Sequence, residues 1–276
     1  MATKNAKNAH FWQVDNKVKN IFSTEGVIVL PSPQAWEKFS WTRKFFEKKP
    51  KEGYFVWVKE QTQKPLTTCV SMGSFKTSQN LTNLLVIEKN IKTKANVVCN
   101  ALKKNLCSSH KAKGKLILKE GASLEYNHNH SWGEKDIVNI DYQFVLEKNS
   151  QLSFIYKNQS PPKSLEMKES LLLKGEGSQG SIKLRLLGRK NSKILAKSSI
   201  IALAAGKGHL DCQGLLIDKN SVISLTPELV CKNPQAQITH EASIGKISGE
   251  ELSYLRMRGL AESEAIDLIV NGFLET

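Results

Sequence analysis

The sequence lacks the features that would assign it to several common classes of protein. None of its five cysteines forms a CxxC pair of the kind used in redox motifs and zinc ribbons. The first residues, MATKNAKNAHFW, contain no apolar core of a signal peptide, and no apolar run is long enough to span a membrane. We therefore expect a cytoplasmic protein with free thiols and no membrane contact.

Concentrated charge of one sign is also absent. The formal net charge is +14, but the lysines are spread over the whole length, without an arginine-rich arm. No RNP motif, zinc-finger spacing or helix-turn-helix pattern accompanies them. We interpret most of these lysines as solvated surface, and we do not expect a nucleic-acid partner.

The first 60 or so residues are the least regular part of the chain. VIVLPS predicts a short strand, and PQAWEKFSWTRKFFEKK predicts an amphipathic helix with Trp36, Phe39, Phe45 and Phe46 near helical spacing. We expect residues 1–64 to form a small α/β segment whose helix packs on its own domain.

Residues 65–246 have the alternation of β-strands, as in Ile140, Tyr142 and Phe144. A phrase recurs between these runs: a charged residue, Gly or Asn, a small residue and then a strand. Its turn positions are separated by near multiples of fourteen residues, which is typical of a solenoid. We predict a β-helix or stacked β-roll, with an irregular β-sandwich as the alternative. The turn positions are Gly121, Asn149, Asn191, Asn220 and Asn233.

Residues 247–276 predict two helices. Ser248 and Glu251 have the spacing of a capping box, and Gly259 is a natural helix end. The second helix, AESEAIDLIVNGF, has an apolar stripe. Such helices either cap a solenoid or offer a docking surface to another protein.

The repeat length brings distant polar residues together. In a coil of about 28 residues, Cys212 lies near the His240–Glu241 pair of ITHEAS. Only one of His240 and Glu241 shares a face with Cys212 unless a bulge intervenes. The three side chains together suit iron or zinc, or a cysteine nucleophile with a histidine base.

A second polar group lies upstream. Cys99 and His110 are eleven residues apart, and YNHNHSW places Tyr126, His128 and His130 on one face of a strand. This ladder suits a metal site, but we interpret it as a surface strand that carries two histidines.

The carboxy-terminal sequence "DCQGLLID…TPELVCKNPQAQITHEASIGKISGEELSYLRMRGLAESEAIDLIVNGF" resembles the C-terminal half of the SufB/SufD family, the scaffold proteins of the SUF iron–sulfur cluster assembly system. A weaker similarity runs from Cys99 through His110 and GASLEY to Trp132, so that the resemblance covers about residues 65–276. It implies a mainly β fold: a right-handed parallel β-helix with a small N-terminal α/β segment and two C-terminal helices.

The resemblance implies that a transient iron–sulfur cluster is built where two β-helix proteins meet. Cys212 and Glu241 match residues that SufB supplies to this interface, and His240 matches the histidine of SufD. Cys231 matches a further thiol often seen in SufB. Because one chain carries all three ligand types, we expect a SufB-like protein that forms a homodimer, with a heterodimer as the alternative.

The resemblance also implies partners. Cys99, with His110, matches a region of SufB that accepts sulfur from a cysteine desulfurase system. The C-terminal helices match those that bind the ABC-type ATPase SufC. The residues that we expect to contact this ATPase are Leu252, Tyr254, Leu255, Ile266, Ile269 and Phe273.

The chain is shorter than most members of that family, and we do not expect it to bind a flavin. We expect a scaffold protein without catalytic activity of its own. Two alternatives stay open. One is an inactive paralogue that acts only as an interaction module, and the other is a β-helix enzyme, although the chain shows no acidic ladder of the kind such enzymes carry.

Overall fold

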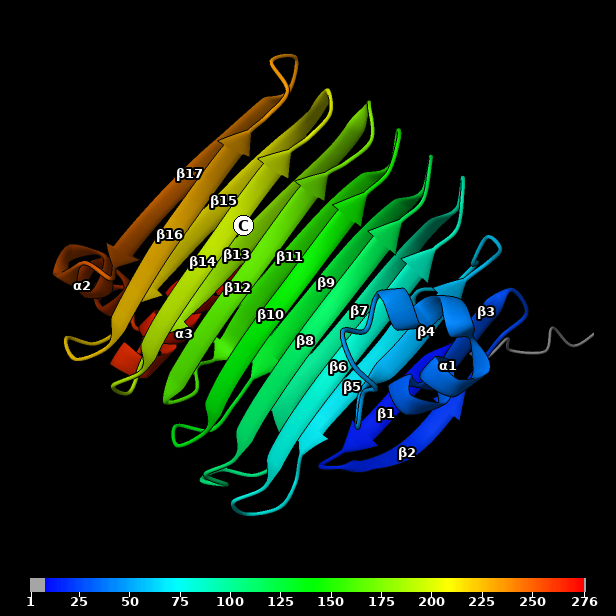
Figure 1. The fold of residues 1–276 in the computed structure, drawn as a ribbon. Helices are drawn as coiled ribbons and strands as arrows, with labels where there is room; N and C mark the ends of the chain where they lie inside the picture. Colours follow the sequence, from blue (N-terminus) through cyan, green and yellow to red (C-terminus); the bar gives the residue numbers. More distant parts are fainter. Residues whose placement is uncertain (1–7, 276) are drawn as a thin grey trace, which may run out of the picture.

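Two facing β-sheets dominate the computed structural model, which describes residues 8–275. From β5 onward, successive strands alternate between the two sheets, and each strand pairs in parallel with the strand two places along the chain. The result is a stack of coils (Figure 1). This arrangement confirms the predicted β-helix and excludes the β-sandwich alternative.

The first sheet has nine strands within the described residues. Its parallel strands all pair in register with their neighbours, and the antiparallel hairpin of β1 and β2 closes it at the N-terminal end. In spatial order the strands are β2 (Lys17–Phe22), β1 (His10–Val14), β5 (Leu66–Met72), β7 (Lys92–Ala101), β9 (Ser123–Ser131), β11 (Gln151–Ser160), β13 (Ser178–Gly188), β15 (Gly206–Leu216) and β17 (Gln237–Lys246).

The second sheet has eight strands within residues 8–275. Its first pair, β3 with β4, is antiparallel and the rest are parallel. In spatial order the strands are β3 (Val27–Pro31), β4 (Tyr54–Val58), β6 (Ser78–Ile87), β8 (Ser109–Leu118), β10 (Ile137–Leu146), β12 (Ser164–Leu173), β14 (Lys193–Ala202) and β16 (Val222–Cys231).

The core lies between the two sheets. Alternate residues of each strand point inward, which explains the period-two pattern of the sequence. Space inside is tight: a Cβ atom at Gly114 would lie 1.8 Å from the Tyr142 ring, so this coil needs a glycine there. At the corners, Gly121, Asn149 and Asn191 have the positive φ expected of them. Asn220 and Asn233 do not, so that part of the turn prediction was wrong.

The N-terminal segment is joined to the solenoid. β1 pairs in parallel with β5, and β4 pairs in parallel with β6, so the strands of residues 1–64 extend the same two sheets. The single helix predicted for residues 33–49 was wrong. α1 (Ser32–Lys38) ends where Phe39 adopts an extended conformation, and a short 3-10 helix, Ser40–Lys44, follows. The break lets Phe39 pack against Phe55 and Trp57.

Two helices follow the last coil, as predicted. α2 (Gly249–Met257) begins with the Ser248–Glu251 capping box, and Gly259 has a φ of +96° behind it. α3 (Glu262–Glu275) packs Val270 and Leu274 against Leu187 and Leu215, on the outer face of the first sheet. Among the described residues, no helix combines the length and the hydropathy needed to cross a bilayer.

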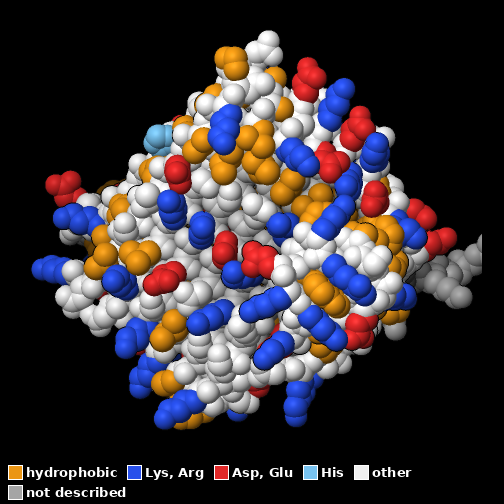
Figure 2. Space-filling view, viewed as in Figure 1, with side chains coloured by type: hydrophobic (Ala, Val, Ile, Leu, Met, Phe, Trp, Pro, Cys, Tyr) orange, Lys and Arg blue, Asp and Glu red, His pale blue; other side chains and the backbone are white. Residues whose placement is uncertain are grey.

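The charge is distributed as the sequence indicates. In Figure 2, lysine and arginine side chains are scattered over the second sheet and α1, with acidic side chains among them. Lys197, for example, pairs with Glu228 on the outer face. No part of this view is a continuous basic surface.

Candidate functional site

Cys212 lies near the C-terminal end of the core. It occupies an inward-facing position of β15 between Leu210 and Gly214, and only 2% of its surface is exposed. The residue directly opposite on β17 is Ala242. The alternation of β15 fixes the direction of the thiol, because its even-numbered residues face the core.

The last coil is longer than the earlier ones, and this changes the expected register. Ser178 pairs with Gly206, 28 residues on, whereas Lys207 pairs with Gln237, 30 residues on. Cys212 is therefore opposite neither His240 nor Glu241, although a 28-residue coil would place it there. The two extra residues lie in the segment between β15 and β17.

The register decides which of the two shares a face with the thiol. His240 lies opposite the inward-facing Leu210, so it belongs to the same face as Cys212, one inward position away from Ala242. Glu241 lies opposite Asp211 and points to the outer face. The structure thus brings together Cys212 and His240 and separates Glu241 from them.

This end of the solenoid is uncovered. β17 is exposed along nearly its whole length, even at positions such as Ile244 that face inward by register. Cys231 ends β16 opposite the inward-facing Ala202, and it is exposed. The described structure therefore leaves the inner face of the last coil open to another molecule.

Burial keeps the Cys212 thiol protonated. Desolvation raises the pKa of Cys212 to about 12, although a hydrogen bond with Ser198 opposes the rise. The same hydroxyl donates to Glu169 Oε2 at 3.1 Å. Burial raises the pKa of Glu169 to about 8. Metal binding at Cys212 must therefore displace a proton into a neutral, buried setting.

Asp211, on the outer face beside Glu241, is held by a buried cation. Arg185 donates to both carboxylate oxygens, at 3.0 and 2.8 Å. Burial raises the pKa of Asp211, but the hydrogen bonds and charge of Arg185 outweigh it and hold the pKa below its usual value.

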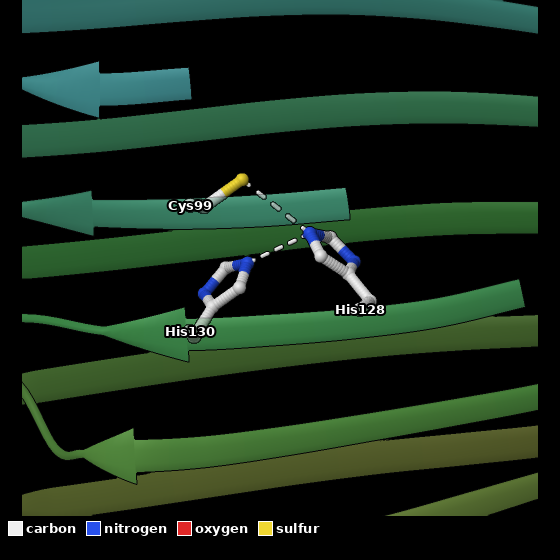
Figure 3. A group of neighbouring side chains, drawn as sticks. All are labelled: Cys99, His128 and His130. Carbon is white, nitrogen blue, oxygen red and sulfur yellow. Dashed lines mark hydrogen bonds between the residues drawn. The ribbon is translucent and has the colours of Figure 1, made fainter. Parts of the chain in front are cut away.

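A second cluster lies deep in the core at the other end of the solenoid. Cys99 comes from β7, and His128 and His130 come from β9 (Figure 3). Cys99 Sγ is 3.4 Å from His128 Nε2, and the two histidine Nε2 atoms are 2.8 Å apart. Each histidine is 1% exposed, so the interpretation of a surface strand was wrong.

The sequence contained a signal for this cluster. Tyr126 and Trp132 have the same parity as the two histidines, and both are buried. Two large aromatic residues on one face of a strand indicate the core side, and the histidines between them had to follow. Sequence reasoning paired Cys99 with His110 instead.

His110 takes part from the opposite sheet. Its Nδ1 atom is 2.7 Å from Gln79 Oε1, and its ring stacks on Trp132 with centroids 4.9 Å apart. Burial lowers the pKa of His110 and of His128 to about 3 and raises that of Cys99. At neutral pH the cluster is therefore uncharged.

The two clusters are separate sites. Cys99 and Cys212 lie on strands of the same sheet, with β9, β11 and β13 between them. Four strand spacings correspond to roughly 19 Å. No single metal centre spans this distance.

The C-terminal helices use much of their apolar surface internally. Ile266, Ile269 and Phe273, three of the residues expected to contact a partner, are half-buried against the chain's own core. Leu252 and Leu255 are half-buried, whereas Tyr254 is 54% exposed. The outward apolar surface of these helices also includes Met257 and Leu268, which the sequence did not single out.

Comparisons with known proteins agree with the resemblance seen in the sequence. Residues 202–273, which include Cys212, His240 and both helices, match the family model described as "SUF system FeS cluster assembly, SufBD core domain".

Longer alignments extend the similarity to most of the chain. A SufBD family iron–sulfur cluster assembly protein of Archaeoglobus fulgidus is 27% identical over 99% of this chain and 86% of the relative. One from Methanothermobacter thermautotrophicus is 25% identical over 96% of this chain and 77% of the relative. The SufB protein of Bacillus subtilis is 25% identical over 81% of this chain and 55% of its own length. On these similarities and its β-solenoid, the chain belongs to the SufBD family of iron–sulfur cluster assembly proteins.

Proposed function

We propose that the chain is a scaffold component of a SUF-type iron–sulfur cluster assembly complex and that the nascent cluster forms at the open end of the solenoid. The observation that carries this proposal is the shared face of Cys212 and His240, at the uncovered inner surface of the last coil. The cluster is cargo that must leave, so the site has to bind it less firmly than four cysteines would.

The donor set suits this task. A thiolate and an imidazole are good ligands for iron, and together they form a mixed site. Cys231, exposed at the end of β16, offers a further thiol on the inner face. Glu241, on the outer face of β17, is not part of the pair within one protomer, and it joins the cluster only if assembly reorients the edge strand.

One protomer supplies too few ligands, which favours a dimer. Two copies that meet at β16 and β17 would each bring a Cys212–His240 pair and would cover the exposed side chains of both last coils. Edge strands with unpaired backbone groups readily accept another strand. We therefore propose a homodimer, and light scattering of the purified chain together with its ATPase tests this. A complex that forms only with a third protein would support a heterodimer with another SufB/SufD-type protein.

The energy source in this proposal is a SufC-like ABC ATPase that docks on α2 and α3. Tyr254, Met257 and Leu268 are the exposed apolar residues that it would cover. ATP hydrolysis then takes place in the partner, and the chain itself acts as a scaffold.

Sulfur would come from a cysteine desulfurase system, with Cys99 as its acceptor. Cys99 is only 3% exposed, so a protein-bound persulfide cannot reach it in the closed coil. Transfer therefore requires local opening around β7, which the ATPase cycle would drive. Alkylation of Cys99 by a small reagent should be slow in the free chain and faster with ATPase and ATP.

Anaerobic reconstitution with iron and sulfide tests the scaffold site. The wild type with ATPase should develop the absorption of a bound cluster, and Cys212→Ala should lose it. Cys69→Ala, which alters a half-buried cysteine on β5, is the matched control and should keep the absorption. If neither the wild type nor the control binds a cluster, the inactive interaction module becomes the better account.

A further inference from the structure

The cluster of Cys99, His128 and His130 has the spacing of a metal site. Its three ligand atoms all lie within 4.8 Å of one another, in a buried pocket (Figure 3). By distance alone, one thiolate and two imidazoles would suit zinc or copper. A fourth residue, Trp132, changes this conclusion.

Trp132 determines where His130 carries its proton. The indole N–H can only donate, and it donates to His130 Nδ1 at 2.9 Å. His130 Nδ1 must therefore hold a lone pair, and the neutral ring carries its hydrogen on Nε2. That hydrogen points to His128 Nε2, 2.8 Å away, so the proton of His128 lies on Nδ1.

This tautomer is the wrong one for a metal ligand. To bind a metal through Nε2, His130 would need a lone pair there and a hydrogen on Nδ1, facing the indole N–H. Metal-bound histidines normally offer their second N–H to an acceptor. Here a donor occupies that position. Protonation of His130 is opposed in the same way, and burial lowers its pKa well below the usual value.

The indole is itself held in place. Trp132 is buried and stacks on the His110 ring, which is anchored by Gln79. To turn its N–H away, the indole would have to disturb both residues.

We propose that Trp132 fixes His130 in the Nε2–H tautomer and thereby prevents Cys99, His128 and His130 from capturing a metal ion. Cys99 then remains a free thiol next to His128 Nε2. The proposal goes beyond the scaffold function. Only its consequence for sulfur chemistry rests on the proposed role of Cys99.

Cobalt(II) binding in the Cys212→Ala background tests the proposal, because that background removes the thiol of the other site. Cys212→Ala alone should show no thiolate-to-cobalt charge-transfer band. Adding Trp132→Phe, which keeps an aromatic ring but removes the N–H, should produce the band and tighten binding by about 10- to 100-fold. Adding Cys99→Ala as well should abolish it. Trp57→Phe, which removes an indole N–H bonded to Glu88, is the matched control and should change nothing.

Two results would overturn the proposal: thiolate–cobalt binding at Cys99 while Trp132 is present, or no gain in a folded Trp132→Phe protein. Nitrogen-15 NMR of the histidine rings in the unmodified chain gives an independent answer if the variant does not fold. It should show His130 protonated on Nε2, and protonation on Nδ1 would contradict the proposal. Neither readout depends on cluster assembly, so a failure here is distinct from a failure of the scaffold proposal.

Discussion

Cys212 on β15 lies in register with Ala242 on β17, so both side chains belong to the inner face of the solenoid. His240 shares that face, and Glu241 points the other way. This relationship ranks the two neighbours as ligands and gives the first prediction.

His240→Ala should reduce the iron bound at limiting iron by about tenfold or more, because it removes a ligand from the face of Cys212. Glu241→Ala, its matched control on the same strand, should cost less than about twofold. Iron content after anaerobic reconstitution checks both. A greater loss with Glu241→Ala would show that the edge strand turns over on assembly.

Metal affinity at Cys212 should rise with pH. Burial raises the pKa of Cys212 to about 12, so the thiol is protonated throughout the working range and binding must release its proton. The apparent association constant should therefore gain about one log unit per pH unit from this group. Cobalt titrations between about pH 6.5 and 8.5 measure the slope. Cys212→Ala should lose this contribution, and equal slopes in both proteins would refute the assignment.

Glu169 should make the protein less stable as pH rises. Burial raises its pKa from 4.5 to about 8, so between these values the folded state holds a proton that the unfolded state has lost. The free energy of unfolding then falls with pH, by at most about 1.4 kcal/mol per pH unit. Above the pKa of unfolded histidine, at about pH 6.5, the buried histidines no longer contribute a slope. Glu169→Gln should flatten the curve from there to about pH 8.

Urea unfolding at several pH values measures this slope. Glu166→Gln, on the outer face of the same strand, is the control and should keep the wild-type slope. Parallel curves for Glu169→Gln and the wild type would mean that Glu169 is not buried as a neutral acid.

Arg185→Met should destabilise the fold by about 3 kcal/mol, because it leaves the largely buried Asp211 carboxylate without its bidentate partner. Lys197→Met breaks an exposed ion pair with Glu228 and should cost less than about 1 kcal/mol. Chemical denaturation compares the two. A similar small effect for both would show that Lys183 or water compensates for the loss of Arg185.

Much of the architecture could be predicted because it is local. Alternating apolar residues and recurrent Asn or Gly turns indicate stacked coils, and the capping box at Ser248 marks the start of α2. The register at Cys212 could not be predicted in the same way. It depends on two extra residues in one coil, and repeat spacing does not say how the connection absorbs them.

The second cluster was missed for a related reason. The parity of His128 and His130 placed them on one face, but only the packing of both sheets shows that this face is the inside. The break of the predicted N-terminal helix at Phe39 likewise depends on aromatic partners on β4, which are distant in sequence.

The exposure of β17 also means that protection against unfolding decreases along the stack. A coil in the middle has a neighbour on each side, whereas the last one has a neighbour on one side and its inner face uncovered. Its amides should exchange with solvent faster than those of β11 or β13. His240 therefore lies on the part of the solenoid that frays most readily, and its coordination geometry is completed by whatever docks there.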